Sequence, residues 1–132
     1  MRTKLLILAL SALALSGCAK RTVPPGDVGI CFHVQPQKDG SLKYNKLPSA
    51  QPDMEHCAAA LESMRVRFLR LGGSNREIYG AYQGNFIFIQ KEGIFTAPSL
   101  EAHRYLALVR TGDGRLAVPG AMPMEAPAPE GQ

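Results

Sequence analysis

The sequence predicts an α+β fold in which a small antiparallel sheet, arranged as a meander, packs on one amphipathic helix to give two layers. Short runs rich in β-branched and aromatic residues recur between turn-forming dipeptides, which is typical of strands. One longer segment instead repeats its apolar residues every three or four positions, which is typical of a helix. Strand candidates stand on both sides of that segment, and this order of elements favours an α+β sandwich.

Two strand candidates precede the helix. They cover residues 28–34 (VGICFHV) and 42–47 (LKYNKL). Residues 36–40 (PQKDG) lie between them, and the Asp-Gly pair there suits a tight hairpin turn. We therefore expect the two strands to form a hairpin.

The helix begins at Pro52-Asp53, because proline is tolerated in a first helical turn, and it ends at Gly72-Gly73. Three- and four-residue spacing places its apolar side chains on one face. These are Met54, Cys57, Leu61, Met64, Phe68 and Leu71. That face needs a sheet to cover it.

The segment after the helix supplies most of the sheet. Its β-prone runs are residues 77–82 (EIYGAY), 86–90 (FIFIQ), 94–96 (IFT), 104–110 (RYLALVR) and 115–118 (RLAV). Tight turns belong between them, at Gly84-Asn85, Glu92-Gly93 and Asp113-Gly114.

Two of these runs, residues 86–89 and 105–109, are apolar on both sides, unlike strands with one wet face. A single helix covers only one face of a sheet. The other face is either covered by curling of the sheet into a half-barrel, or it is a surface for a protein partner or a second copy of the chain. With such a partner, we expect Phe88 or Leu108 to be exposed in the isolated chain.

Residues 1–18 have the composition of an export signal. Residues 1–4 are basic, residues 5–15 are nearly all leucine, isoleucine and alanine, and small residues precede Cys18. The apolar run is typical of a signal peptide and too short for a membrane-spanning helix, which needs about 20 residues. Leu15-Ser16-Gly17-Cys18 resembles the lipobox of bacterial lipoproteins.

The resemblance implies that residues 1–17 are removed and that Cys18 carries a diacylglycerol and an acyl chain such as palmitate on its new amine. Several chains hold a protein durably on a membrane, at about 0.8 kcal/mol per buried methylene. Ala19 stands where an aspartate commonly signals inner-membrane retention, so the resemblance implies the periplasmic face of the outer membrane. The alternative is an ordinary signal peptide with an unrelated cysteine.

The predicted domain organisation follows from these segments. Residues 18–27 form a polar tether, residues 28–118 a single globular domain, and residues 119–132 a proline-rich disordered tail. The net charge of +4 falls to +2 when Arg2 and Lys4 leave with the signal peptide, since 13 basic residues then face 11 acidic ones. Neither this charge nor an envelope location favours a nucleic-acid partner.

Cys31 and Cys57 fall in the predicted first strand and helix, and an exported domain folds where cysteine pairs persist. We expect a disulfide that joins helix to sheet and closes a loop of about 27 residues, worth roughly 3 to 4 kcal/mol. Buried free thiols, or a zinc site shared with His33 and His56, are the alternatives. Zinc requires His56 and Cys57 to aim at one ion, although adjacent helix positions diverge by about 100°.

No residue pattern indicates an enzyme, a cofactor or a metal centre. The chain lacks a G-x-S-x-G elbow, an S-x-x-K pair, an H-E-x-x-H helix and a phosphate-binding loop. His33, His56 and His103 are scattered along the sequence, and Glu55 and Glu62 are a heptad apart, as on a solvated helix surface. We therefore expect a non-catalytic role.

The densest group of cations surrounds the end of the helix. It comprises Arg65, Arg67, Arg70 and Arg76. The helix dipole stabilises cations there by about 0.3 to 1 kcal/mol each, which explains the group without a ligand. The functional interpretation is an anionic partner, namely lipid phosphates, lipopolysaccharide or the carboxylates of peptidoglycan.

Two functions therefore remain open. One is an accessory or scaffold lipoprotein that holds an envelope protein, or a second copy of itself, on its sheet face. The other is a binder of an anionic envelope polymer. A strand (residues 31–35), a helix containing CAAALESM (residues 57–64) and further strands resemble half of the peptidoglycan-binding sporulation-related repeat, whose second helix is missing here. The whole chain resembles small envelope lipoproteins of Gram-negative bacteria, from which no activity is transferred.

Overall fold

The structure is a computed structural model that describes residues 20–74 and 77–120. Cys18, Arg76 and the tail from residue 121 onward lie outside the described residues. The elements are β1 (Cys31–Pro36), β2 (Leu42–Lys46), α1 (Met54–Arg70), β3 (Ile78–Tyr82), β4 (Asn85–Ile89), β5 (Ile94–Ala97), β6 (Tyr105–Arg110) and β7 (Leu116–Ala117). Each predicted strand and the helix form within a few residues of the expected bounds.

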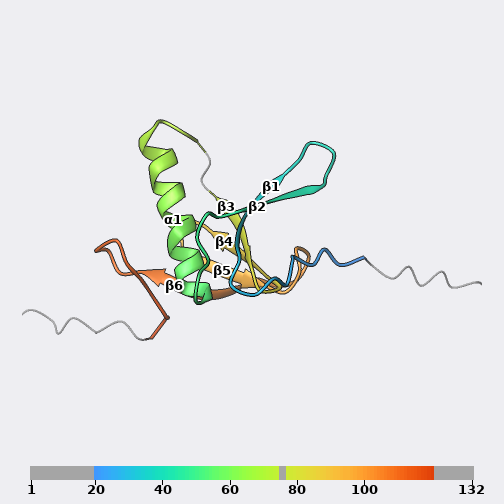
Figure 1. The fold of residues 1–132 in the computed structure, drawn as a ribbon. Helices are drawn as coiled ribbons and strands as arrows, with labels where there is room; N and C mark the ends of the chain where they lie inside the picture. The colour runs from blue at the N-terminus through green and yellow to red at the C-terminus, as the bar shows by residue number, and fades with distance from the viewer. Residues whose placement is uncertain (1–19, 75–76, 121–132) are drawn as a thin grey trace, which may run out of the picture.

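The strands pair antiparallel in the order β2-β1-β3-β4-β5-β6-β7, and α1 lies across one face of this sheet (Figure 1). From β3 onward each strand pairs with the next, as in the predicted meander. Before it, β1 rather than β2 pairs with β3, because α1 carries the chain from β2 back to the free edge of β1. The predicted α+β fold is confirmed.

Local chemistry defines both ends of α1. At its start, the Asp53 carboxylate accepts a hydrogen bond from the backbone N–H of His56 at 2.8 Å, which caps the first turn. At its end, Gly72 adopts a φ of 86°, and the N–H of Gly73 donates to the carbonyl of Phe68 at 3.0 Å. The Gly-Gly pair therefore ends the helix as predicted.

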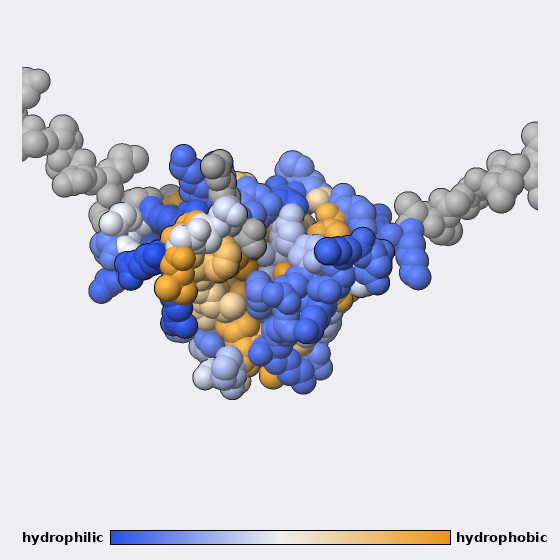
Figure 2. Space-filling view, turned by 90° about the horizontal axis from the view of Figure 1, so that it is seen from above, coloured by the Kyte–Doolittle hydropathy of each residue, from blue (hydrophilic) through white to orange (hydrophobic). Residues whose placement is uncertain are grey.

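The last turn of α1 leaves apolar side chains in solvent. Phe68, Leu69 and Leu71 are 43%, 36% and 81% exposed. Figure 2 looks onto this end of the helix and shows apolar atoms gathered among hydrophilic ones. The prediction that the apolar stripe is covered as far as Phe68 and Leu71 is wrong, because the last turn extends beyond the sheet (Figure 1).

The core beneath α1 is centred on Leu61. This side chain is fully buried and packs on Gly80 of β3, where an added Cβ would overlap it and approach the carbonyl of Phe32 at 3.1 Å. Ile87 and Ile89 of β4 complete the same layer. A glycine in the middle of a strand is thus what lets the helix approach the sheet closely.

The other face of the sheet is also buried, by parts of the same chain. A second apolar cluster there contains Phe32, Val34, Ala81, Phe86, Phe88 and Ala97. The connection between β5 and β6 folds back over it, with Leu100 and Ala102 packed against the cluster. The guanidinium carbon of Arg104 lies 3.6 Å from the centre of the Phe88 ring, and its Nη1 is 2.7 Å from Glu77.

Two alternatives were open for this face, namely cover by curling of the sheet or exposure to a partner, and these contacts show instead that a loop of the same chain covers it. Phe88 is 0% exposed and Leu108 is 1% exposed, so neither side chain is available to a partner. For Phe88 the physical reason is that residues 98–104 form a loop that covers the sheet face opposite α1, whereas Leu108 is buried on the other face, in the cluster beneath α1. Curling of the sheet is therefore not needed to hide this face.

The globular body begins before residue 28. Pro24 is buried, and the carbonyls of Thr22 and Pro25 accept hydrogen bonds from the backbone N–H groups of Leu100 and Gly84, both at 3.0 Å. Within the predicted tether of residues 18–27, residues 22–25 are thus docked on the domain. Within the two described ranges, no helix combines the length and apolar character needed to cross a bilayer.

Candidate functional site

Cys31 and Cys57 form a disulfide, with their Cα atoms 5.4 Å apart. Both residues are 0% exposed, and the bond joins β1 directly to α1. The zinc and free-thiol alternatives do not hold in this structure, because both sulfurs are bonded to each other. Across residues 20–74 and 77–120, no three histidine, cysteine or acidic side chains gather in a way that could hold a metal ion.

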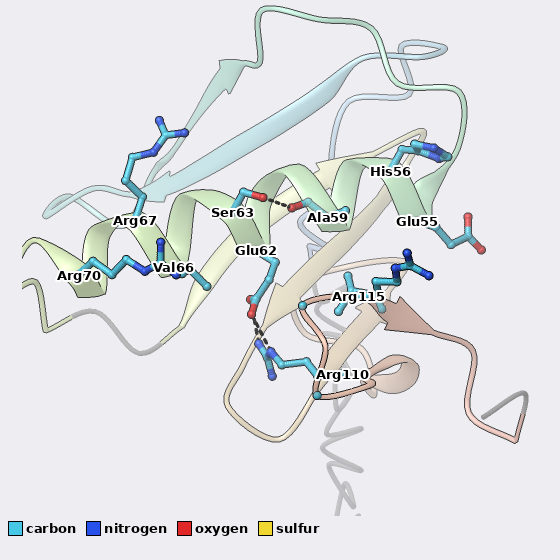
Figure 3. Close-up of a pocket in the computed structure, with 13 residues that line it drawn as sticks. Glu55, His56, Ala59, Glu62, Ser63, Val66, Arg67, Arg70, Arg110 and Arg115 are labelled. Carbon is cyan, nitrogen blue, oxygen red and sulfur yellow. Dashed lines mark hydrogen bonds and ion pairs between the residues drawn. The ribbon is translucent and has the colours of Figure 1, made fainter. Parts of the chain in front are cut away.

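A groove of about 820 Å³ lies between the outer face of α1 and the hairpin formed by β6 and β7 (Figure 3). Four arginines line it, and we call it the basic groove. They are Arg67, Arg70, Arg110 and Arg115. Its volume falls in the range of about 300 to 1,000 Å³ that is common for ligand sites.

The helical repeat explains why α1 forms one wall. Ala59, Ser63, Val66 and Arg70 recur at spacings of four, three and four residues, so they share the face turned away from the buried Cys57 and Leu61. The small side chains of Ala59 and Ser63 leave the centre of this face hollow. The Ser63 hydroxyl donates to the Ala59 carbonyl at 3.0 Å rather than projecting into the groove (Figure 3).

An ion pair closes the floor of the groove. Arg110 of β6 donates from Nε and Nη2 to the two carboxylate oxygens of Glu62 at 2.7 and 2.8 Å, and from Nη1 to the Lys91 carbonyl at 2.9 Å. The hydrogen bonds to Glu62 raise the pKa of Arg110. Each of its three side-chain nitrogen atoms donates to the protein, so Arg110 builds the site and holds the hairpin on α1.

The other three cations remain available. Arg67 and Arg70 are exposed and have no ion pair within residues 20–74 and 77–120, while Arg115 reaches only Asp113, at 3.9 Å, with its side chain 84% exposed. In Figure 3, Arg70 lies along α1 toward Val66, and Arg115 extends from the opposite wall toward Glu55. Arg67 points away from Arg110 and Arg115 in the same view. The described lining holds four arginines and two carboxylates, those of Glu55 and Glu62, so the groove is electropositive.

The predicted arginine cluster is only partly brought together. Arg67 and Arg70 line the groove, but Arg65 does not, because its side chain is only 12% exposed and lies 3.5 Å from Glu62. Arg76 lies outside the described residues. Sequence reasoning missed Arg110 and Arg115, since their only signal was a place in β-prone runs far along the chain from the helix.

The histidines do not converge on a reactive site. His33 lies in β1, where burial lowers its pKa, and it lines a second, smaller pocket together with Glu77. His56 lies 2.6 Å from the Asp53 carboxylate at the start of α1, and the His103 ring packs edge-on against Tyr105 at 4.9 Å. Each histidine therefore has its own local contacts on a different element.

The geometry of the groove suits the binding of an anion, with two walls, a fixed floor and cations on both sides. Comparison with known proteins gives no family to guide its interpretation: no family model, curated protein or solved structure matches the chain.

Proposed function

We propose that this chain is a lipid-anchored envelope protein with a non-catalytic role, and that its basic groove binds a carboxylate-bearing envelope polymer such as peptidoglycan. The observation that carries the proposal is the electropositive groove, which Arg67 borders and in which the guanidinium groups of Arg70 and Arg115 are available to a ligand. The lipobox-like segment ending at Cys18 supports a lipid anchor, and Ala19 after it supports the periplasmic face of the outer membrane.

The chemistry of the groove favours carboxylates carried on a chain. Arginine binds a carboxylate through two parallel hydrogen bonds, which fixes both its position and its orientation. The groove is open at its surface, and cations stand on both walls, so an extended polymer can lie along α1 and meet several of them. On the α1 wall, Ala59 and Val66 offer a small apolar surface to small side chains such as the methyl groups of alanine.

Co-sedimentation of the purified, detergent-solubilised protein with peptidoglycan tests this proposal. We expect the protein to pellet with the polymer, and the double variant Arg67→Glu, Arg70→Glu to lose this. Exposed ionic contacts contribute about 0.2 to 1 kcal/mol each, so loss of two lowers the affinity about 2- to 30-fold, and charge reversal lowers it further. Raising the salt to about 1 M, where the Debye length is about 3 Å, is expected to weaken binding similarly.

The matched control is Lys43→Glu, Lys46→Glu, which makes the same change of net charge on β2, at two exposed positions that do not line the groove. We expect this control to bind as the native protein does. Equal loss of binding in both double variants would show that only net charge matters. Absence of binding by the native protein would reject the polymer proposal.

A protein partner is the second candidate, and the exposed apolar end of α1 favours it. The surface formed by Phe68, Leu69 and Leu71 replaces the sheet face as the place for such a contact. In-cell cross-linking tests this role. We expect Leu71→Asp to abolish a cross-linked complex without unfolding the protein, and an unchanged set of complexes would reject the idea.

A further inference from the structure

The segment that leads toward Cys18 is latched onto the domain. The backbone N–H and the hydroxyl of Thr22 both donate to the Glu101 carboxylate, at 2.9 and 2.6 Å. The next contacts are the backbone hydrogen bonds from Leu100 to the Thr22 carbonyl and from Gly84 to the Pro25 carbonyl. We call residues 22–25 the N-terminal arm.

The arm is part of the folded body rather than a strand of chain resting on it. Pro24 is buried, and Leu100, whose backbone holds the arm, packs into the apolar cluster on the sheet face opposite α1. Releasing the arm would therefore expose apolar surface and leave the Leu100 and Gly84 amide groups to water. The hydrogen bonds from Thr22 also lower the pKa of Glu101, so this carboxylate is ionised at neutral pH.

Little chain remains between the arm and the lipid-bearing residue. Only residues 19–21 separate Cys18 from Thr22, and at about 3.3 Å per residue these two positions are at most about 13 Å apart. A compact domain of roughly 100 residues has a radius of gyration of about 13 Å, and its full thickness is at least twice that radius. The distance from Cys18 to Thr22 is therefore shorter than the domain is thick. A body latched at Thr22 cannot stand away from the lipid surface.

The basic groove lies on the opposite side of the molecule from this latch. Figure 1 shows the N-terminal segment leaving one side, while α1 and β7, whose residues form the groove walls, lie on the other. Lys20 and Arg21 are exposed on the latch side.

From these observations we propose that the N-terminal arm holds the domain directly against the membrane, with Lys20 and Arg21 among phosphate headgroups and the basic groove facing away from the bilayer. The inference rests on the lipid anchor of the proposed function, and it deepens that proposal by orienting the groove. Cations next to an anionic lipid surface are attracted to it within about a Debye length. The orientation places the groove where an extended polymer of the envelope can reach it.

The docking of the arm is tested first, without lipid, by hydrogen exchange of the full-length protein in detergent. We expect the amide groups of Leu100 and Gly84 to be protected, and Glu101→Ala to speed their exchange about tenfold or more, because it removes the acceptor of both Thr22 donors. Glu101→Gln keeps one acceptor oxygen and is expected to restore part of the protection. Fast exchange at both amides in the native protein would overturn the latch.

The orientation is tested with the native lipidated protein in vesicles of phosphatidylethanolamine and phosphatidylglycerol. A fluorescent amino acid is placed at Val23 in the arm or at Ser63 in the groove, both exposed. We expect a quencher attached to lipid headgroups to quench the Val23 probe strongly and the Ser63 probe little. A flexible Gly-Ser linker inserted between Arg21 and Thr22 is expected to reduce quenching at Val23.

Each failure has its own signature. Equal quenching at the two positions, or stronger quenching at Ser63, in protein that floats with the vesicles would overturn the orientation while the anchor stands. Protein that does not float with vesicles would remove the anchor, and with it this orientation. Loss of polymer binding in the peptidoglycan assay would reject the groove's proposed ligand and leave the quenching result unaffected.

Discussion

The disulfide between Cys31 and Cys57 makes the most quantitative prediction. The perturbation is the double variant Cys31→Ala, Cys57→Ala, which removes the cross-link and leaves a small apolar side chain at each position. The two residues are 26 positions apart, and the loop-entropy relation for that separation gives about 3.5 kcal/mol at 25 °C. Loss of two fully buried sulfur atoms from the core adds about 1 kcal/mol.

The expected loss is therefore about 4 to 5 kcal/mol, against a total stability of about 5 to 15 kcal/mol for a domain of this kind. The assay is urea unfolding of the oxidised native protein and the double variant, followed by circular dichroism. We expect a lower midpoint and a larger denaturant dependence in the variant, because its unfolded chain is no longer constrained by the cross-link.

A second measurement separates the cross-link from the packing of the sulfur atoms. The native protein unfolded in the presence of a thiol reductant is expected to lose about 3.5 kcal/mol, since its sulfur atoms stay in place on refolding. Both sulfurs are 0% exposed, so reduction under native conditions is expected to wait for opening of the domain. A loss below about 1 kcal/mol in both experiments would refute the reasoning.

Three further predictions concern the packing of the sheet faces and the arm. Gly80→Ala places a methyl group where a leucine of α1 packs, and is expected to destabilise the domain by about 1 to 3 kcal/mol in urea unfolding; no loss would contradict the close approach. Arg104→Ala removes an ion pair and the contact with Phe88, and is expected to cost about 1 to 2 kcal/mol in the same assay, with a negligible change counting against a covering role. The hydrogen bonds from Thr22 lower the pKa of Glu101, so the latch contributes stability above the ordinary glutamate pKa of about 4.3 and loses it as the pH falls through the lower pKa of the folded state. The measurement is hydrogen exchange of the Leu100 amide, which donates to the Thr22 carbonyl, corrected for its intrinsic rate. We expect this exchange to accelerate in that acidic range, and pH-independent protection would contradict the prediction.

The fold was accessible from local patterns. The three- and four-residue spacing of Cys57 and Leu61 gave the helix and its buried face, and the Gly72-Gly73 pair gave its end. The first strand begins at Cys31 rather than Val28, because the chain before it turns through Gly29 at a φ of 73°. Such local cues follow from backbone geometry and hydrophobic periodicity, which a sequence displays directly.

Two features could not be predicted in the same way: the loop that covers the second sheet face, and the basic groove. Arg104 covers Phe88 only because the preceding loop folds back over the sheet, and Arg110 meets Glu62 only after the meander brings β6 beside α1. These contacts join residues that are distant in sequence and share no periodic pattern. The docking of Thr22 on Glu101, across 79 positions, was hidden for the same reason.

Photo-cross-linking in living cells tests the central claim, that the basic groove holds a carboxylate-bearing envelope polymer, most directly. A photoreactive amino acid is placed at Ser63 in the groove, and in a matched variant at Lys43 on β2; both positions are exposed. After illumination, we expect peptidoglycan fragments covalently attached to the protein at Ser63 and not at Lys43. Equal attachment at both positions, or none at Ser63, would contradict the account.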